Sequence, residues 1–203
     1  MMKSFTKTKH FARLLVLLFC LGFTVSHTIA QSIASWEFTG ISGQASVVPK
    51  FVVNGVTVSS AEIGPGLIAN EYLSNGLTAR GQTTSTLTEA IAADEYISFT
   101  VTPDQGKAIS ITSVQIRPVS QGITRYFSLL SSVNGFTPEN EIGEISGNNE
   151  FGAALETIAV NGHTRLTSAV TFRVYIYGTG SNEWLSTGFG NRDSNLTEDD
   201  LFV

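Results

Sequence analysis

Cysteine is nearly absent from this sequence. The 203 residues contain one, Cys20, which lies within an apolar run near the N-terminus. An intramolecular disulfide and a cluster of thiolate metal ligands are therefore excluded. Histidine is also scarce, because only His163 lies beyond residue 30. A Ser/His/Asp hydrolase needs an imidazole base, and typical zinc sites combine several His or Cys ligands. His163 follows an Asn-Gly pair, so we expect a solvated loop residue and neither kind of site.

Positive charge is the second deficiency. All 17 acidic residues follow Ala30, whereas four of the 12 basic residues precede it. The region from Gln31 onward therefore has eight basic and 17 acidic residues, a formal net charge of −9. Nucleic acids and anionic membranes are bound by clustered Lys and Arg side chains. We expect neither as a partner, and we attribute the negative charge to solubility.

A long apolar run is also missing. The basic N-terminal residues precede an apolar stretch from Leu14 to Val25, and small or polar residues follow it up to Ala30. This order is typical of a secretory signal peptide, and about twelve apolar residues are too few to span a bilayer. We therefore predict a signal peptide at 1–30 and a single domain at 31–203, secreted or at the cell surface, without membrane insertion after processing.

Turn sequences take the place of helical periodicity in residues 31–203. Asn-Gly pairs occur at 54–55, 75–76, 134–135 and 161–162, each between apolar stretches. Such pairs favour type I′ turns, which join antiparallel strands into hairpins. The sequence therefore predicts antiparallel β structure.

Apolar and polar residues alternate strictly in 96–102 and 169–177, which predicts half-buried strands with Tyr175 and Tyr177 on the outer face. Between Ile109 and Arg117 the apolar positions change parity, so we expect a bulge or kink near residue 112. Further strands are predicted at 33–38, 125–131, 141–145, 155–160 and 199–203, with two short strands or one hairpin within 47–63 and a loop at 178–195.

One helix is predicted, because Thr86 and Glu89 have the spacing of a capping box before an Ala-rich run. Eight to ten strands with almost no helix predict an all-β fold. We expect an antiparallel two-sheet β-sandwich, in the form of a jelly roll, with at most one short helix. A closed barrel is the alternative. Trp36 is expected to anchor the core.

Four stretches together resemble uncharacterised, secreted bacterial β-sandwich domains that often occur in proteins with cell-surface sorting tails. These stretches are Ser35 to Gly40, Ala90 to Gly106, Leu130 to Phe136, and Val170 to Tyr175. The resemblance implies an exported sandwich module and supplies no catalytic residues. Because this chain ends at Val203 without a sorting tail, we expect release at least as readily as surface attachment.

The 178–195 loop and its surroundings contain the candidate ligand-binding residues. Sugar sites combine an aromatic platform with polar groups at its rim, and a Trp in a long surface loop is unusual. Trp184 is the predicted platform; the alternative is that its indole folds down as a lid over the core. The other residues predicted to contact a glycan are Tyr175, Tyr177, Asn182, Glu183, Asn191 and Arg192.

Oxygen-bearing side chains cluster after this loop, at Asp193, Asn195, Asp199 and Asp200, with Glu198 between them. Ca²⁺ prefers six to eight oxygen ligands, so a structural calcium ion is a candidate, although the spacing does not match a helix-loop-helix calcium site. Solvated acids at a strand start are the alternative. We expect no other cofactor.

The sequence therefore favours an exported, monomeric, non-catalytic module that binds a polysaccharide or cell-surface glycan. Two alternatives stay open. One is a glycoside-active enzyme that uses a pair of carboxylates, for which Glu37 and Glu95 are the first candidates. The other is a purely structural or adhesive surface protein.

Overall fold

The computed structural model describes residues 31–71, 75–147, 154–179, 185–190 and 199–203. Residues 32–203 form one compact unit. The predicted signal peptide lies outside the described residues and stays a prediction. Within the described ranges, no helix has the length and apolar character needed to cross a bilayer.

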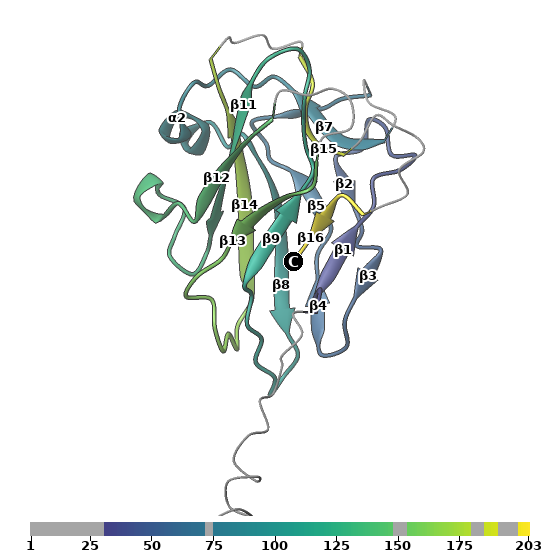
Figure 1. Ribbon diagram of the computed structural model, residues 1–203, viewed down its shortest axis with the longest axis vertical. Helices are drawn as coiled ribbons and strands as arrows, with labels where there is room; N and C mark the ends of the chain where they lie inside the picture. The colour runs from purple at the N-terminus through teal and green to yellow at the C-terminus, as the bar shows by residue number, and fades with distance from the viewer. Residues whose placement is uncertain (1–30, 72–74, 148–153, 180–184, 191–198) are drawn as a thin grey trace, which may run out of the picture. The chain divides into compact units, whose positions relative to one another are not determined.

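The described chain folds into three open antiparallel sheets (Figure 1). The five-stranded sheet has the order β13 (Glu156–Ala159), β9 (Ser113–Ile116), β16 (Leu201–Phe202), β1 (Ala34–Trp36) and β3 (Phe51–Val52). The seven-stranded sheet has the order β12 (Gly143–Gly147), β11 (Arg125–Ser131), β14 (Val170–Tyr177), β8 (Tyr96–Pro103), β5 (Ala61–Ile63) and β2 (Ser46–Val47), with β4 (Val56–Val58) also paired to β8. The four-stranded sheet has the order β10 (Pro118–Ser120), β15 (Thr187–Gly190), β7 (Gly76–Arg80) and β6 (Ile68–Ala69).

Helical structure is limited to α2 (Leu87–Ala92) and the 3₁₀ turn η1 (Pro138–Asn140) in the described residues. The prediction of an all-β antiparallel sandwich with one short helix is therefore confirmed. The third sheet is a feature that the sequence analysis did not foresee.

The core is a column of aromatic rings between strands of different sheets. Trp36 of β1 lies 5.0 Å from Phe99 of β8, and Phe99 stacks on Phe172 of β14 at 5.4 Å between ring centroids. All three side chains are at most 1% exposed. Burying such a side chain stabilises the fold by about 2 to 3 kcal/mol. The prediction that Trp36 anchors the core is confirmed.

The two strictly alternating segments form the centre of the seven-stranded sheet. In β8 every second side chain, from Ile97 to Val101, is buried, and β14 lies between β11 and β8 as a central strand. The predicted strand from Ile109 to Arg117 is interrupted instead. Ile109 forms an isolated bridge with Leu166, and regular pairing resumes at β9. The parity change is accommodated by this break, which leaves Ile111 buried with the rest of the core.

The Asn-Gly pairs do not form the predicted type I′ turns. Gly55, Gly135 and Gly162 have positive φ, but the asparagines that precede them do not. A type I′ turn requires positive φ at both residues. The turn at 54–55 also joins strands of two sheets, because β3 pairs with β1 and β4 pairs with β8. The prediction of a hairpin at this turn is therefore wrong, and residues 47–63 contain the end of β2 and the short strands β3, β4 and β5.

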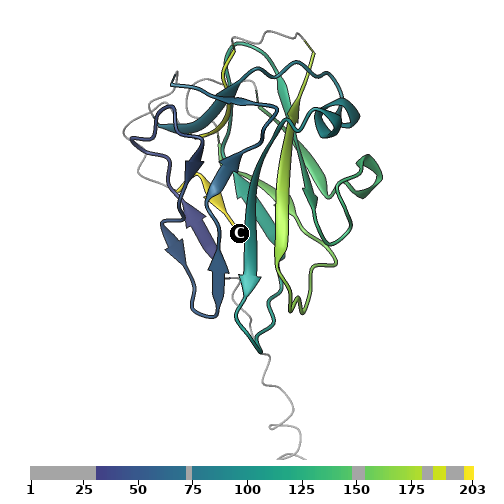
Figure 2. The ribbon, with the colours of Figure 1, turned by 180° about the vertical axis from the view of Figure 1, so that it is seen from behind.

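Helix α2 begins as the sequence predicts. The Thr86 hydroxyl accepts a hydrogen bond from the Glu89 amide, and the Glu89 carboxylate accepts one from the Thr86 amide. Figure 1 and Figure 2 show α2 beside the upper part of the seven-stranded sheet. Ala90 packs there against Leu130, Tyr175 and other outward-facing residues of that sheet. The helix therefore covers part of a sheet face that would otherwise meet solvent.

Candidate functional site

Most of the predicted glycan site lies outside the described residues. This holds for Trp184 and for its predicted neighbours Asn182, Glu183, Asn191 and Arg192. Their assignment stays a prediction.

Tyr175 and Tyr177 lie on the outer face of β14, as the alternation predicts, but they are not accessible there. Tyr175 is fully buried and Tyr177 is 8% exposed, and both belong to one buried apolar cluster with Ala90 of α2 and Leu130 of β11. Tyr96 also meets Tyr175 edge-on at 5.4 Å between centroids. Both residues are predicted to contact a glycan, but in this structure neither ring face is free to stack on a ligand.

The predicted calcium ligands are divided. Asp193 and Asn195 lie outside the described residues. Asp199 accepts a hydrogen bond from Lys50 at 3.0 Å, and Lys50 also contacts Glu37 at 2.6 Å. These two carboxylates raise the pKa of Lys50 to about 12, chiefly through the hydrogen bond to Glu37. In the described part of the chain, no three His, Cys, Asp or Glu side chains group closely enough to hold a metal ion.

Asp200 is a buried structural carboxylate in this structure. It is 3% exposed, and its two oxygens accept from the Phe38 amide and from Arg117 Nε, each at 3.1 Å. Burial outweighs both of these interactions and raises the pKa of Asp200 to about 6. Asp200, just before β16, is thereby joined to Phe38, which follows β1, and to Arg117, which follows β9.

His163 is a core residue, so the prediction of a solvated loop histidine is wrong. It is fully buried and stacks on Phe172 at 5.7 Å between centroids. Its Nε2 lies 2.6 Å from the Ser131 hydroxyl, and its Nδ1 lies 3.0 Å from the Asn161 carbonyl. The carbonyl can only accept, so Nδ1 carries a hydrogen, and in the neutral ring with this tautomer Ser131 donates to Nε2. Both side chains are inaccessible to a substrate.

The two carboxylates first considered for catalysis also have structural partners. Glu37 is held by Lys50, whose hydrogen bond lowers the pKa of Glu37. Glu95 is 1% exposed and accepts hydrogen bonds from the Thr83 amide and hydroxyl and from the Thr84 hydroxyl. Glu37 and Glu95 therefore do not form an accessible catalytic pair.

A different group of residues meets on the outer face of β11, β12 and β14. Tyr126 of β11 lies opposite Tyr177 of β14, and Ser128 lies opposite Glu144 of β12. Strand alternation turns these four side chains to one side of the sheet. Glu141, just before β12, reaches the same place. We call Tyr126, Ser128, Glu141, Glu144 and Tyr177 the tyrosine-glutamate face.

Short oxygen-oxygen contacts connect four side chains of this face in a chain. The Ser128 hydroxyl donates to Glu141 Oε1 at 2.5 Å, and the Tyr177 hydroxyl donates to Glu144 Oε2. The two hydroxyl oxygens lie 2.9 Å from each other. Ser128 and Tyr177 are buried, whereas Glu141 and Glu144 are exposed. The buried hydroxyls therefore fix the positions of two solvent-accessible carboxylates.

The electrostatics of the tyrosine-glutamate face are negative. Burial is the main reason that the pKa of Tyr177 is raised, and the carboxylates of Glu144 and Glu141 raise it further. Among the residues that the structure describes, neither glutamate has an ion-pair partner. The Tyr126 ring is partly exposed and stacks on Tyr177 at 5.6 Å, with an interplanar angle of 26°. The face thus combines an aromatic surface with two positioned acceptors.

Arg173, a cation on β14, is already engaged. Its guanidinium lies 4.2 Å from the centroid of Tyr96 and 4.3 Å from that of Phe136. It donates to the Tyr175 hydroxyl at 3.1 Å and lies 3.9 Å from Asp94. Arg173 is therefore held between two rings and is not aimed at the two glutamates.

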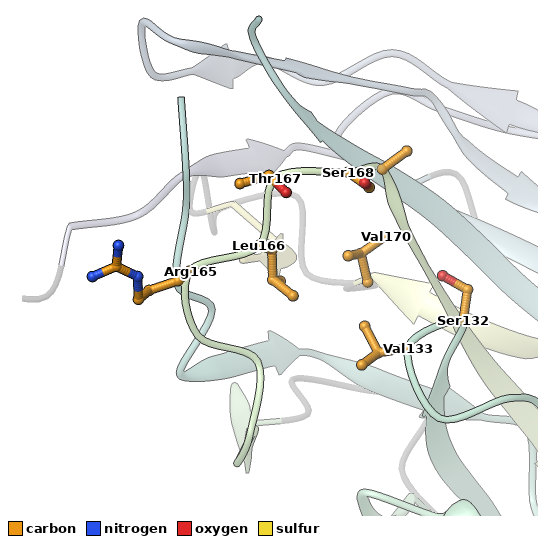
Figure 3. Close-up of a pocket in the computed structure, with 8 residues that line it drawn as sticks. Ser132, Val133, Arg165, Leu166, Thr167, Ser168 and Val170 are labelled. Atoms are coloured by element: carbon orange, nitrogen blue, oxygen red, sulfur yellow. The ribbon is translucent and has the colours of Figure 1, made fainter. Parts of the chain in front are cut away.

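A shallow pocket lies elsewhere, where the end of β11 meets the segment before β14. It has a volume of about 340 Å³. Figure 3 shows Val133, Leu166 and Val170 directed toward the opening, while Arg165 extends away from it. Ser132 lies at the side, but its hydroxyl accepts a hydrogen bond from the Thr171 amide. The pocket is lined by apolar and polar residues, with Arg165 as its one charged residue in the described part of the chain.

The sequence contains the signals for the tyrosine-glutamate face, although the analysis did not combine them. Tyr126 and Ser128 occupy alternate positions of a predicted strand, and Glu141 and Glu144 belong to the next one. Only the pairing of β11 with both β12 and β14 brings them together. Comparison of the chain with models of protein families gives no match, and neither does comparison with curated proteins.

Proposed function

We propose that the protein is an exported, non-catalytic module that binds a glycan through the tyrosine-glutamate face. One observation carries the proposal: two exposed carboxylates, Glu141 and Glu144, are held by buried hydroxyls beside the partly exposed ring of Tyr126. Secretion, and membership among the secreted bacterial sandwich domains that the sequence resembles, are parts of the same proposal.

The chemistry of the face suits a sugar. The apolar face of a pyranose packs on an aromatic ring, and its hydroxyl groups donate to carboxylates in short, charge-assisted hydrogen bonds. Because Ser128 and Tyr177 hold the carboxylates, little side-chain entropy is lost when a ligand binds. Preorganisation of this kind increases affinity without adding contacts.

A glycan array followed by calorimetric titration tests the proposal. We expect Tyr126→Ala and Glu144→Gln each to weaken binding of the best array ligand by about tenfold or more, which corresponds to about 1.4 kcal/mol. Glu62→Gln is the matched control, because Glu62 is an exposed carboxylate on β5 of the same sheet and makes the same charge change. Loss of affinity in the control equal to that in Glu144→Gln would contradict the site assignment.

Trp184 provides a separate test of the predicted loop site. Trp36 is fully buried, so a ligand that changes tryptophan emission without unfolding the protein reports on Trp184. A ligand-dependent change that disappears in Trp184→Phe would include the 178–195 loop in the site. Unchanged emission at a ligand concentration that saturates the calorimetric signal would limit the site to the tyrosine-glutamate face.

A glycoside-active enzyme is the second candidate, and the hydrogen-bonded chain from Glu141 to Glu144 favours it. Two carboxylates in one site are the catalytic apparatus of most glycosidases. This candidate predicts turnover of a bound glycan that falls by at least about a hundredfold in both Glu141→Gln and Glu144→Gln. Binding without turnover would exclude the enzyme and favour the non-catalytic module. Absence of any glycan binding would favour a structural or adhesive role.

A further inference from the structure

The hydrogen-bond polarity of the tyrosine-glutamate face is unbalanced. The chain from Glu141 through Ser128 and Tyr177 to Glu144 has three oxygen-oxygen contacts. Ionised carboxylates only accept, and each hydroxyl has one hydrogen. Two hydrogens therefore serve three contacts. When Ser128 donates to Glu141 and Tyr177 donates to Glu144, the buried contact between the two hydroxyl oxygens has no hydrogen of its own.

Both hydroxyl hydrogens are engaged by the glutamates, so neither hydroxyl has a hydrogen to offer a ligand. Ser128 itself is buried, so a ligand reaches only the exposed Glu141 and Glu144. Their ionised carboxylates have further lone pairs and can only accept hydrogen bonds. The face therefore favours ligands that donate hydrogen bonds over ligands that accept them.

The charges select the same kind of ligand. Within the described residues Glu141 and Glu144 have no ion-pair partner. Arg173 already contacts two aromatic rings, the Tyr175 hydroxyl and the Asp94 carboxylate. The partly exposed ring of Tyr126 is also attractive to a cation. A primary ammonium has three donors, no acceptor and a positive charge. Of the polar groups that glycans display, the free amine of an amino sugar best matches the face.

We infer that the tyrosine-glutamate face selects glycans with free amino groups, such as unacetylated hexosamine oligomers, over N-acetylated and acidic glycans. This inference rests on the proposed function, because it names the ligand class of the same site. An acetamide has one donor and gains an acceptor, and a uronic acid adds a negative charge. Both changes reduce complementarity to the two glutamates.

Calorimetric titration with three oligomers of equal length tests the inference: glucosamine, N-acetylglucosamine and a uronic acid, at a mildly acid pH at which the amines are charged. We expect the glucosamine oligomer to bind at least tenfold more tightly than the acetylated oligomer, and the uronic acid oligomer to bind most weakly. The preference for the free amine should disappear in both Glu141→Gln and Glu144→Gln. It should persist in Glu62→Gln, which loses the same charge from the same sheet.

Two results separate this inference from the proposed function. Equal affinity for the amino and acetylated oligomers, lost in Tyr126→Ala, would overturn the amine selectivity and keep the glycan site. Equal weakening of glucosamine binding in Glu62→Gln and Glu144→Gln would reveal general attraction to an acidic protein and would also overturn the inference. Absence of binding to all three oligomers and to a glycan array would remove both proposals.

Discussion

Single polar residues in this protein take their roles from their neighbours. His163 and Glu95 have the chemistry of catalytic groups, yet both are buried and fully engaged, with Ser131 in one case and with Thr83 and Thr84 in the other. Glu141 and Glu144 are positioned just as firmly, but they remain in contact with solvent. Accessibility combined with positioning therefore distinguishes the candidate site from the structural polar groups.

Asp200 gives stability a dependence on pH that can be assigned to one residue. Its pKa of about 6 in the folded protein exceeds the ordinary value of 3.8, so this group stabilises the fold fully below about pH 4. The contribution is lost as the pH rises through about 6 and amounts to about 3 kcal/mol in total. Urea unfolding at a series of pH values should show this decline in the original protein and not in Asp200→Asn. The same slope in both proteins would contradict the assignment.

Gly188 is required by a close approach of two strands. A Cβ atom at this position would lie 2.2 Å from the Leu77 carbonyl oxygen, and its φ of +151° is unfavourable for other residues. We expect Gly188→Ala to lower the free energy of unfolding by more than about 3 kcal/mol. Gly106→Ala is the control, because φ is also positive there but nothing lies within 4 Å. It should cost about 1 kcal/mol. Similar urea midpoints for the two variants would refute the argument.

At the scale of elements, helix α2 is held by its cap and by the face it covers. Replacing Thr86 with Ala removes the acceptor for the Glu89 amide and should cost about 1 kcal/mol. Because the Ala90 and Ala93 amides donate to the Thr86 and Glu89 carbonyls, fraying of α2 should also speed hydrogen exchange of these two amides. Thr102→Ala, on β8, is the control and should leave exchange in α2 unchanged. Equal protection of α2 in both variants would show that the cap contributes nothing.

Elements with a strong local signal could be predicted from the sequence. The alternation in 96–102 and 169–177 became β8 and β14, and the capping box became the start of α2. Strand β15 was missed, and residues 72–84 were expected to form a loop with at most a short edge strand, whereas β7 is an inner strand of its sheet. Gly76, Gly188 and Gly190 weaken the strand pattern in both places. In the structure Gly188 and Gly190 instead allow β15 to approach the β7 backbone closely. A rule that treats glycine as a strand breaker fails where backbones are in contact.

For the molecule as a whole, the fold class was predictable from the sequence, whereas the tyrosine-glutamate face was not. Periodicity and turn content specify an antiparallel sandwich without any knowledge of strand order. The tyrosine-glutamate face requires that order, because β11 must lie between β12 and β14 before Tyr126 can meet Tyr177 and Ser128 can meet Glu144. The covering of Tyr175 by α2 is likewise a tertiary effect that strand alternation cannot reveal.

The proposed glycan site is the tyrosine-glutamate face, where β11, β12 and β14 carry Tyr126, Glu144 and Tyr177 and Glu141 lies just before β12. Mapping of backbone amide chemical shifts by NMR during titration with the best array ligand tests it most directly. If the glycan binds this face, the largest shifts fall in residues 126–128, 141–146 and 175–177, and they are lost in Glu144→Gln. Saturable shifts confined to the shallow pocket around Leu166, or to other regions away from these strands, would contradict the proposed site.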